Sequence, residues 1–318
     1  MKSLQKSKVC PSEQKDQMIY DGVNRAPQGM AKGQPTGNAN VTSARMNEED
    51  LKVKSVLSSL SPREMDVAAR TAYAYQQDPR RSTQEMFASR IARRYLRAKQ
   101  GKVDIATRRL KDTLEFREKI GVDGLRTAFD AGGSDSLSKP LLMQLRNKKL
   151  FVQGYDKEGR STLIFIPRLV CGHHVEWTLK EAIYSVERAI ACTKASDGTI
   201  NAVVDFSGFS VLRHAPPLDV GRQFMTTLRN HYAGQIHRIY ILNTPVAFSV
   251  FWNIFQPFLG SKTRGKIRFL SGKDRRKLEK YYDLDQVPSW MIPDGTKNKE
   301  LDVQDYLYST PFDRPFNE

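Results

Sequence analysis

Hydrophobic and polar positions change their spacing near residue 150, and this change divides the chain into two parts. Before residue 150, apolar residues recur every three or four positions, which predicts helices over 47–79 and 82–119. Gly101 interrupts the second of these ranges, so a new helix is expected directly after it. Residues 121–139 are rich in Gly, Asp and Ser, which predicts a connection. The first part of the chain is therefore expected to be helical.

After residue 150, short β-rich runs alternate with longer helical patterns. The first two runs flank a turn at 155–160, which predicts a hairpin. The later runs are almost wholly apolar, as in strands that are buried on both faces. Strands that alternate with helices predict an α/β domain with a largely parallel sheet. The expected strands are 150–152, 162–166, 200–206, 238–242 and 267–270, and the expected helices are 179–193, 218–232, 245–259 and 273–282.

The helix expected after Asn243 has an unusual composition. Thr244 is a suitable N-cap and Pro245 suits the first helical position, where a missing N–H costs nothing. The aromatic positions that follow form one wide apolar face, and a cationic run comes directly after them. Such a pair suits contact with an anionic membrane, although a core helix followed by a solvated loop has the same pattern. The apolar positions are Phe248, Phe251, Trp252, Phe255, Phe258 and Leu259, and the cations are Lys262, Arg264, Lys266 and Arg268.

Charge narrows the class of partner without identifying it. The 318 residues carry a net charge of +16. Residues 80–126 hold 14 Lys/Arg against 6 Asp/Glu, and residues 262–280 hold 9 against 2. These clusters attract phosphates, whether on nucleic acid or on lipid headgroups. Residues 1–46 have no apolar period and are expected to be a disordered basic tail.

Several other classes of protein are disfavoured by the sequence. No apolar stretch approaches the roughly 18 residues that a membrane-spanning helix needs, and the N-terminus lacks the apolar core of a signal peptide. Three scattered cysteines form neither a disulfide framework nor a metal-binding spacing, so a cytoplasmic location is expected. Gly260–Lys266 matches a P-loop, but Ile267 replaces its Ser/Thr. The cluster of His173, His174 and Glu176 has no further metal ligand at helical or turn spacing to complete a site. No enzyme, metal or cofactor is therefore expected.

Five short motifs follow one another between residues 82 and 292, about two-thirds of the chain. They are a helix ending in Phe116-Arg117, D-x-x-G-R at 156–160, D-x-x-G-x-S at 205–210, N-x-P at 243–245 and KIRFLSG at 266–272. In this order the motifs resemble those of the CRAL-TRIO lipid-binding family, which includes the yeast-type phosphatidylinositol/phosphatidylcholine transfer proteins.

The resemblance implies an α/β fold in which an N-terminal helical module accompanies a mixed, largely parallel sheet. Helices flank this sheet and enclose an apolar lipid pocket, with the aromatic helix as its gate. The implied divisions are a helical module over 47–125, a lipid-binding domain over 140–292 and a C-terminal tail over 293–318. The pocket and gate residues that follow from it are Phe248, Phe251, Trp252, Phe255, Phe258, Leu259, Ile200, Ala202, Val204, Leu163 and Phe165.

The resemblance also implies cations that bind a lipid headgroup or an anionic membrane, and these correspond to Arg97, Lys99, Lys262, Arg264, Lys266 and Arg268. The sequence departs from the family at two places. Gly234 stands where the family has a glutamate that orients an inositol ring. Ile200 and Ala202 are apolar, whereas the corresponding strand positions of the family are polar and hold a choline headgroup. A sterol, prenol or tocopherol-like cargo therefore stays open beside a phospholipid.

The expected function is to take phosphatidylinositol or another hydrophobic lipid into the gated pocket and to exchange it at anionic membranes. The protein is then a monomer that associates peripherally with membranes and has bound lipid in place of a cofactor. Two alternatives remain. A membrane-recruited adaptor could sense lipid without transferring it. A nucleic-acid-binding protein would need aromatic residues interleaved with cations, whereas here they occupy separate stretches.

Overall fold

The computed structural model describes residues 47–170, 174–215, 218–245 and 248–316. The side chains of Val211, Leu218, Val250, Phe251, Phe255 and Phe258 lie outside this description, as does the expected disordered tail over 1–46.

The N-terminal helices pack around a core of their own, whose centre includes Val56, Ala92 and Leu110. The sequence fixes one helix start closely. Ser61 Oγ accepts a hydrogen bond from the Glu64 N–H at 3.2 Å, and the Glu64 carboxylate accepts one from the Ser61 N–H at 2.7 Å. The helices of this module are α1 (Glu48–Ser58), α2 (Pro62–Arg70), α3 (Tyr73–Gln77), α4 (Arg81–Ala98) and α5 (Val103–Ile120).

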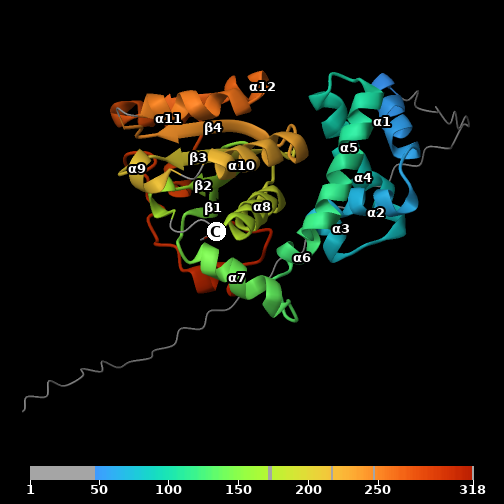
Figure 1. The fold of residues 1–318 in the computed structure, drawn as a ribbon, viewed down its shortest axis with the longest axis horizontal. Coiled ribbons are helices and arrows are strands. Elements are labelled where there is room, and N and C mark those ends of the chain that lie inside the picture. The colour runs from blue at the N-terminus through green and yellow to red at the C-terminus, as the bar shows by residue number, and fades with distance from the viewer. Residues whose placement is uncertain (1–46, 171–173, 216–217, 246–247, 317–318) are drawn as a thin grey trace, which may run out of the picture. The chain divides into compact units, whose positions relative to one another are not determined.

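Five strands form one sheet in the order β1-β2-β3-β4-β5 (Figure 1). The first pair is an antiparallel hairpin and the other pairs are parallel, as the alternation of strands and helices predicts. The strands are β1 (Leu150–Tyr155), β2 (Ser161–Phe165), β3 (Ile200–Asp205), β4 (Ile236–Leu242) and β5 (Ile267–Leu270). The helices among them are η1 (Pro167–Leu169), α8 (Val175–Cys192), α9 (Val211–His214), α10 (Leu218–His231), α11 (Phe248–Phe255), η2 (Gln256–Phe258) and α12 (Ser261–Arg264). The mixed α/β architecture expected from the sequence is confirmed.

The structure adds helices where the sequence predicts a connection. Within 121–139, α6 (Val122–Arg126) follows directly on α5, and α7 (Asp135–Leu145) begins after the glycines. Leu141 and Leu145 of α7 are buried against the main core, so packing compensates for weak local signals and for Pro140 inside the helix. The expected helix over 273–282 is instead the 3₁₀ helix η3 (Gly272–Lys280).

The segment after β5 covers one face of the sheet, which we call the covered face. Ile164 and Val203, which pair across β2 and β3, are fully buried there. They belong to one core with Tyr282, Met291 and Phe316. The range assigned to a C-terminal tail thus contributes Leu301, Tyr306 and Phe316 to this core. It contains the π-helix η5 (Asp305–Ser309), and η4 (Leu284–Gln286) precedes it.

A buried ion-pair cluster joins the helical module to the sheet domain. Glu187 of α8 is 1% exposed. Its carboxylate accepts hydrogen bonds from Arg117 of α5 at 2.5 Å, from Arg126 Nε of α6 at 2.8 Å and from the Tyr232 hydroxyl at 2.8 Å. A further contact nearby is the Tyr95 hydroxyl, which donates to the His231 carbonyl at 3.1 Å. These bonds hold the end of α10 against α4 and α5.

Candidate functional site

The face of the sheet opposite the covered face carries two apolar rows over four strands, and we call these two rows the inner face. Leu163, Ala202, Ile239 and Ile267 form one row across β2 to β5. The second row that faces the same way consists of Phe165, Val204, Ile241 and Phe269.

Burial differs sharply between the two faces. Ile164 and Val203 are 0% exposed on the covered face. Phe165, Ala202 and Val204, their neighbours on the inner face, are only half-buried. An apolar wall that is incompletely covered by the protein itself can accept the apolar part of a ligand.

The aromatic helix α11 lies over this inner face beside β4 and β5 (Figure 1). The Phe248 ring is 4.6 Å from that of Phe206. The Trp252 ring is 5.1 Å from that of Phe269, edge to face. Phe248 is buried, whereas Trp252 and Leu259 are half-buried. The side chains of Phe251, Phe255 and Phe258 lie outside the described ones, so their expected role as gate residues stays a prediction.

Ile200 and Leu163 close the other end of the inner face. Ile200 is 0% exposed and Leu163 is 7% exposed. Both pack with Ala182 and Val186 of α8 in a buried cluster. The open part of the inner face is therefore the half nearer the carboxyl ends of the strands.

The start of α11 is held by a hydrogen-bonded turn after β3. Asp205 accepts hydrogen bonds from the Ser207 N–H at 3.1 Å and from the Asn243 side-chain amide at 2.9 Å. Arg168 of η1 donates to the second oxygen of Asp205 at 3.1 Å. Asp205 therefore stabilises the turn that precedes Gly208. Asn243 has a φ of +53°, which is uncommon for a residue with a side chain.

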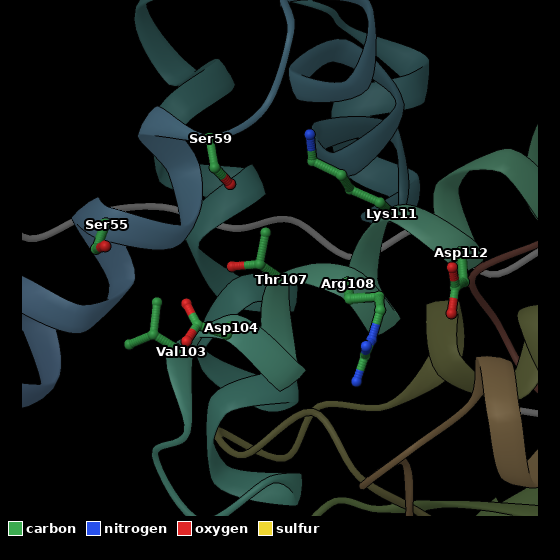
Figure 2. Close-up of a pocket in the computed structure, with 8 residues that line it drawn as sticks. All are labelled: Ser55, Ser59, Val103, Asp104, Thr107, Arg108, Lys111 and Asp112. Carbon is green, nitrogen blue, oxygen red and sulfur yellow. The ribbon is translucent and has the colours of Figure 1, made fainter.

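Two cavities lined by described side chains lie away from α11. One is a surface pocket of about 480 Å³ between α1 and α5, where Ser55 and Ser59 face Asp104 and Thr107 (Figure 2). The other, between α8 and α10 next to Phe224, has about 20 Å³, enough for about one water molecule. The first is mainly polar and the second is very small, so neither has the character of a lipid pocket.

Cations from α5, α10, α12 and the segments that follow α4 and α12 gather where the module meets the sheet domain. We call Lys99, Arg109, Arg229, Lys262 and Lys266 the cationic cluster. Burial lowers the pKa of Lys99, and Arg109, Lys262 and Arg229 lower it further by repulsion. Lys262 Nζ also lies 3.5 Å from the Ala98 carbonyl oxygen. Burial likewise lowers the pKa of Lys266, with Lys262 adding to the effect against the attraction of Asp197. Repulsion of this kind indicates that the cluster lacks sufficient counter-charge.

The structure brings together some of the expected headgroup residues and separates others. Lys99, Lys262 and Lys266 belong to the cationic cluster. Arg97 instead pairs with Glu49 of α1 at 2.7 Å. Arg268 donates to the carbonyl oxygens of Gly265 and Ile267 in its own segment, and Arg264 is exposed.

Sequence reasoning missed Arg109 and Arg229. Both reach the cationic cluster only because α5 and α10 pack together, and neither lies in a motif. No local pattern could have identified them, since their contribution depends on contacts between distant segments.

Gly234 replaces a side chain that the fold has little room for. Its φ is +75°, and a Cβ there would lie 3.2 Å from Arg94 Cγ. Burial lowers the pKa of Arg94. A cation thus occupies the space beside the position where the resemblance leads one to expect a glutamate.

Two further observations concern the described residues alone. None of their helices is both long and apolar enough to cross a membrane. They contain no group of three or more His, Cys, Asp and Glu side chains suited to a metal ion. His173, which forms part of the weak metal pattern in the sequence, lies outside the description.

Comparison with solved structures supports the fold. The crystal structure of Sfh5 matches 84% of this chain and 96% of its own, with a TM-score of 0.57 and 15% sequence identity. At this identity the match concerns the fold alone.

Comparison with known sequences gives distant relatives. A CRAL-TRIO domain-containing protein of Schizosaccharomyces pombe is 27% identical over 62% of this chain and 18% of its own length. The phosphatidylinositol/phosphatidylcholine transfer protein SFH13 of Arabidopsis thaliana is 27% identical over 62% of this chain and 33% of its own. The SEC14 cytosolic factor of Eremothecium gossypii is 26% identical over 63% of this chain and 66% of its own length. The chain thus spans a third or less of the first two.

The CRAL/TRIO domain family model matches residues 145–291, which include the whole five-stranded sheet. The resemblance inferred from the five motifs is thereby confirmed, since residues 145–291 of this chain match the CRAL/TRIO domain family.

Proposed function

We propose that this protein binds a hydrophobic lipid between α11 and the inner face and exchanges it at anionic membranes. The observation that carries the proposal is the half-buried apolar wall formed by Phe165, Ala202, Val204 and Ile239. Each methylene group removed from water there contributes about 0.8 kcal/mol. The names of the Arabidopsis and Eremothecium relatives, a transfer protein and a cytosolic factor, agree with a carrier rather than an enzyme.

The cationic cluster supplies the polar part of the proposal. Lys99, Lys262 and Lys266 carry positive charge that phosphate oxygens would balance. Lys262 lies at the Ala98 carbonyl oxygen and Lys266 donates to the Ile236 carbonyl oxygen, so a bound headgroup would lie between the helical module and the amino end of β4. We expect the protein to associate peripherally with anionic membranes through these cations.

A more apolar cargo is the second candidate. Both rows of the inner face are apolar, Ile200 is fully buried at its closed end, and the Ser161 hydroxyl beside it already donates to the Ala189 carbonyl oxygen. An unpaired polar group placed against such a wall costs about 2–7 kcal/mol. Choline bound deep in the site is therefore disfavoured, whereas a sterol or tocopherol-like lipid needs no polar partner there.

Mass spectrometry of lipids extracted from natively purified protein tests the proposal. We expect one dominant lipid class at near-stoichiometric amount. A phosphate-bearing headgroup favours the role of the cationic cluster, and an uncharged lipid favours the second candidate. Absence of lipid, together with intact vesicle binding, would favour an adaptor and contradict a carrier.

Filling the inner face should exclude cargo without unfolding the protein. Ala202 is half-buried, so Ala202→Phe is expected to cost less stability than the same substitution on the covered face, while reducing bound lipid at least twofold. Val203→Phe is the matched control, because the adjacent side chain is 0% exposed on the covered face and should lose about 1–3 kcal/mol. Lipid content and urea unfolding measure both effects. Unchanged lipid content in folded Ala202→Phe would contradict the proposed pocket.

Removing charge from the cationic cluster should weaken binding to anionic vesicles. Lys262→Gln is expected to reduce the partition coefficient about fivefold at low salt, and less at high salt. Arg97→Gln is the matched control, since Arg97 is paired with Glu49. Vesicle sedimentation at two salt concentrations measures the difference. Equal losses in both variants would indicate a diffuse charge effect rather than a site.

A further inference from the structure

The short helix α9 presents one apolar side chain almost fully to solvent. Leu212 is 98% exposed, more than any other large apolar side chain recorded among the described residues. Arg213 beside it is also exposed and has no ion pair within the described part of the chain. An exposed apolar side chain beside an unpaired cation suits a bilayer surface, because the apolar side chain can contact acyl chains and the cation can contact phosphates.

The conformation of α9 is fixed by local hydrogen bonds. The Ser210 carbonyl oxygen accepts from the N–H groups of Arg213 at 3.2 Å and His214 at 2.9 Å. The Ser210 N–H in turn donates to His214 Nδ1 at 2.9 Å. This one-turn unit holds Leu212 outward, so its exposure follows from ordered backbone.

Contacts connect α9 to the start of the aromatic helix. The Phe209 ring packs edge to face on Phe206 at 4.9 Å, and Phe206 packs on Phe248 of α11 at 4.6 Å. The same turn holds Asn243, whose amide donates to Asp205 and to Ser207 Oγ. Phe209, three residues before Leu212, is therefore linked through Phe206 to the first turn of α11.

Apolar side chains are also exposed on α11 and on β5. Ile254 of α11 is 45% exposed, and Phe269 of β5 is 47% exposed. With Leu212 they give apolar side chains on α9, α11 and β5, within a chain of net charge +16. An anionic bilayer satisfies both the apolar and the cationic requirement, which a purely acidic protein surface does not.

We propose that α9 is a second membrane contact, in which Leu212 enters an anionic bilayer and Arg213 binds its phosphates, and that this contact releases α11 from the inner face. The inference rests on the proposed exchange of lipid, because it assigns to α9 the step that opens the gate at the membrane.

Leu212→Ser in the full chain tests the proposal, with Leu51→Ser on α1 as the matched control at a side chain that is 56% exposed. Each protein is mixed with vesicles that contain phosphatidylserine, and both partition and transfer of a fluorescent phospholipid are measured. We expect Leu212→Ser to lower partition about tenfold and transfer in proportion, with little change in the control. The lipid already bound to the purified variant should be unchanged.

Vesicle binding and transfer by Leu212→Ser at the level of the wild type would overturn the inference, even if the protein carries lipid. The same holds if Leu51→Ser loses as much. Wild-type protein without bound lipid, whose vesicle binding still depends on Leu212, would contradict the proposed exchange and leave the membrane contact of α9 supported.

Discussion

Glu187→Ala is expected to lower the free energy of unfolding by about 3–5 kcal/mol, because two buried guanidinium groups lose their shared carboxylate. Glu187 and Arg126 are each 1% exposed, and Arg117 is 7% exposed. No water can replace the lost charge without opening the contact between α5, α6 and α8. Urea unfolding, followed by far-UV circular dichroism, measures the loss.

Glu176→Gln provides the matched control on the same helix. Glu176 pairs with Lys180 at 2.7 Å, but its side chain is 63% exposed, so less than about 1 kcal/mol is expected. Similar losses in both variants would contradict a special role for the buried cluster. A smaller m value for Glu187→Ala, that is, a shallower fall of the free energy of unfolding with urea concentration, would indicate that the helical module unfolds separately.

The same carboxylate predicts a dependence of stability on pH. Burial raises the pKa of Glu187, but Arg117 and Arg126 outweigh burial and hold it at about 2, below its ordinary 4.5. A lowered pKa means that the unfolded chain binds the proton more readily. The ionised Glu187 carboxylate therefore contributes about 3 kcal/mol to the free energy of unfolding. This contribution is complete above pH 4.5 and is lost as the pH falls toward 2. Glu187→Gln should lack this part of the slope.

Arg188→Met is expected to detach the C-terminal segment and to cost about 3 kcal/mol or more. The Arg188 guanidinium is 1% exposed and lies 3.7 Å from the centre of the Tyr306 ring. It donates to the carbonyl oxygens of Tyr306 at 2.7 Å and of Thr310 at 3.1 Å, and these buried acceptors would lose their donor. Faster amide hydrogen exchange over 301–316 would report the detachment.

A comparison with a second variant tests this interpretation. Removal of residues 303–318 deletes the acceptors themselves, so combining it with Arg188→Met should add much less than the sum of the two effects. Arg63→Met is the matched control, since Arg63 is 78% exposed and pairs with Glu118 at the surface. Additive effects of the deletion and Arg188→Met would contradict the direct role of Arg188.

Patterns within a single element predicted the fold best. Ser61 and Glu64 form a capping box, a motif that needs only four residues. The parallel pairing of β2 to β5 follows from strands that alternate with helices. α7 could not be predicted in this way, because its stability comes from the burial of Leu141 and Leu145 against distant segments. Similarly, the helix expected from Pro245 begins at Phe248 in the structure, with residues 246–247 undescribed.

The candidate site was predictable where residues share a motif or a strand. Ala202 and Val204 are on one face because side chains alternate along β3. Lys262 and Lys266 are four residues apart in one basic run, and both belong to the cationic cluster. Arg97 shows the limit, because its partner Glu49 lies 48 residues earlier in the chain. Charge alone could not distinguish a paired arginine from one available to a phosphate.

The dependence of the covered face on the last part of the chain has a consequence for synthesis on the ribosome. When β5 has emerged, Ile164 and Val203 still lack the core partners Met291 and Phe316. At about 5–20 residues per second, the 46 residues from 271 to 316 take a few seconds to add. A nascent chain therefore holds a complete sheet with one bare apolar side during that interval. Chaperones that bind such surfaces should be found on ribosomes that are translating this final stretch, and slower translation there should increase aggregation.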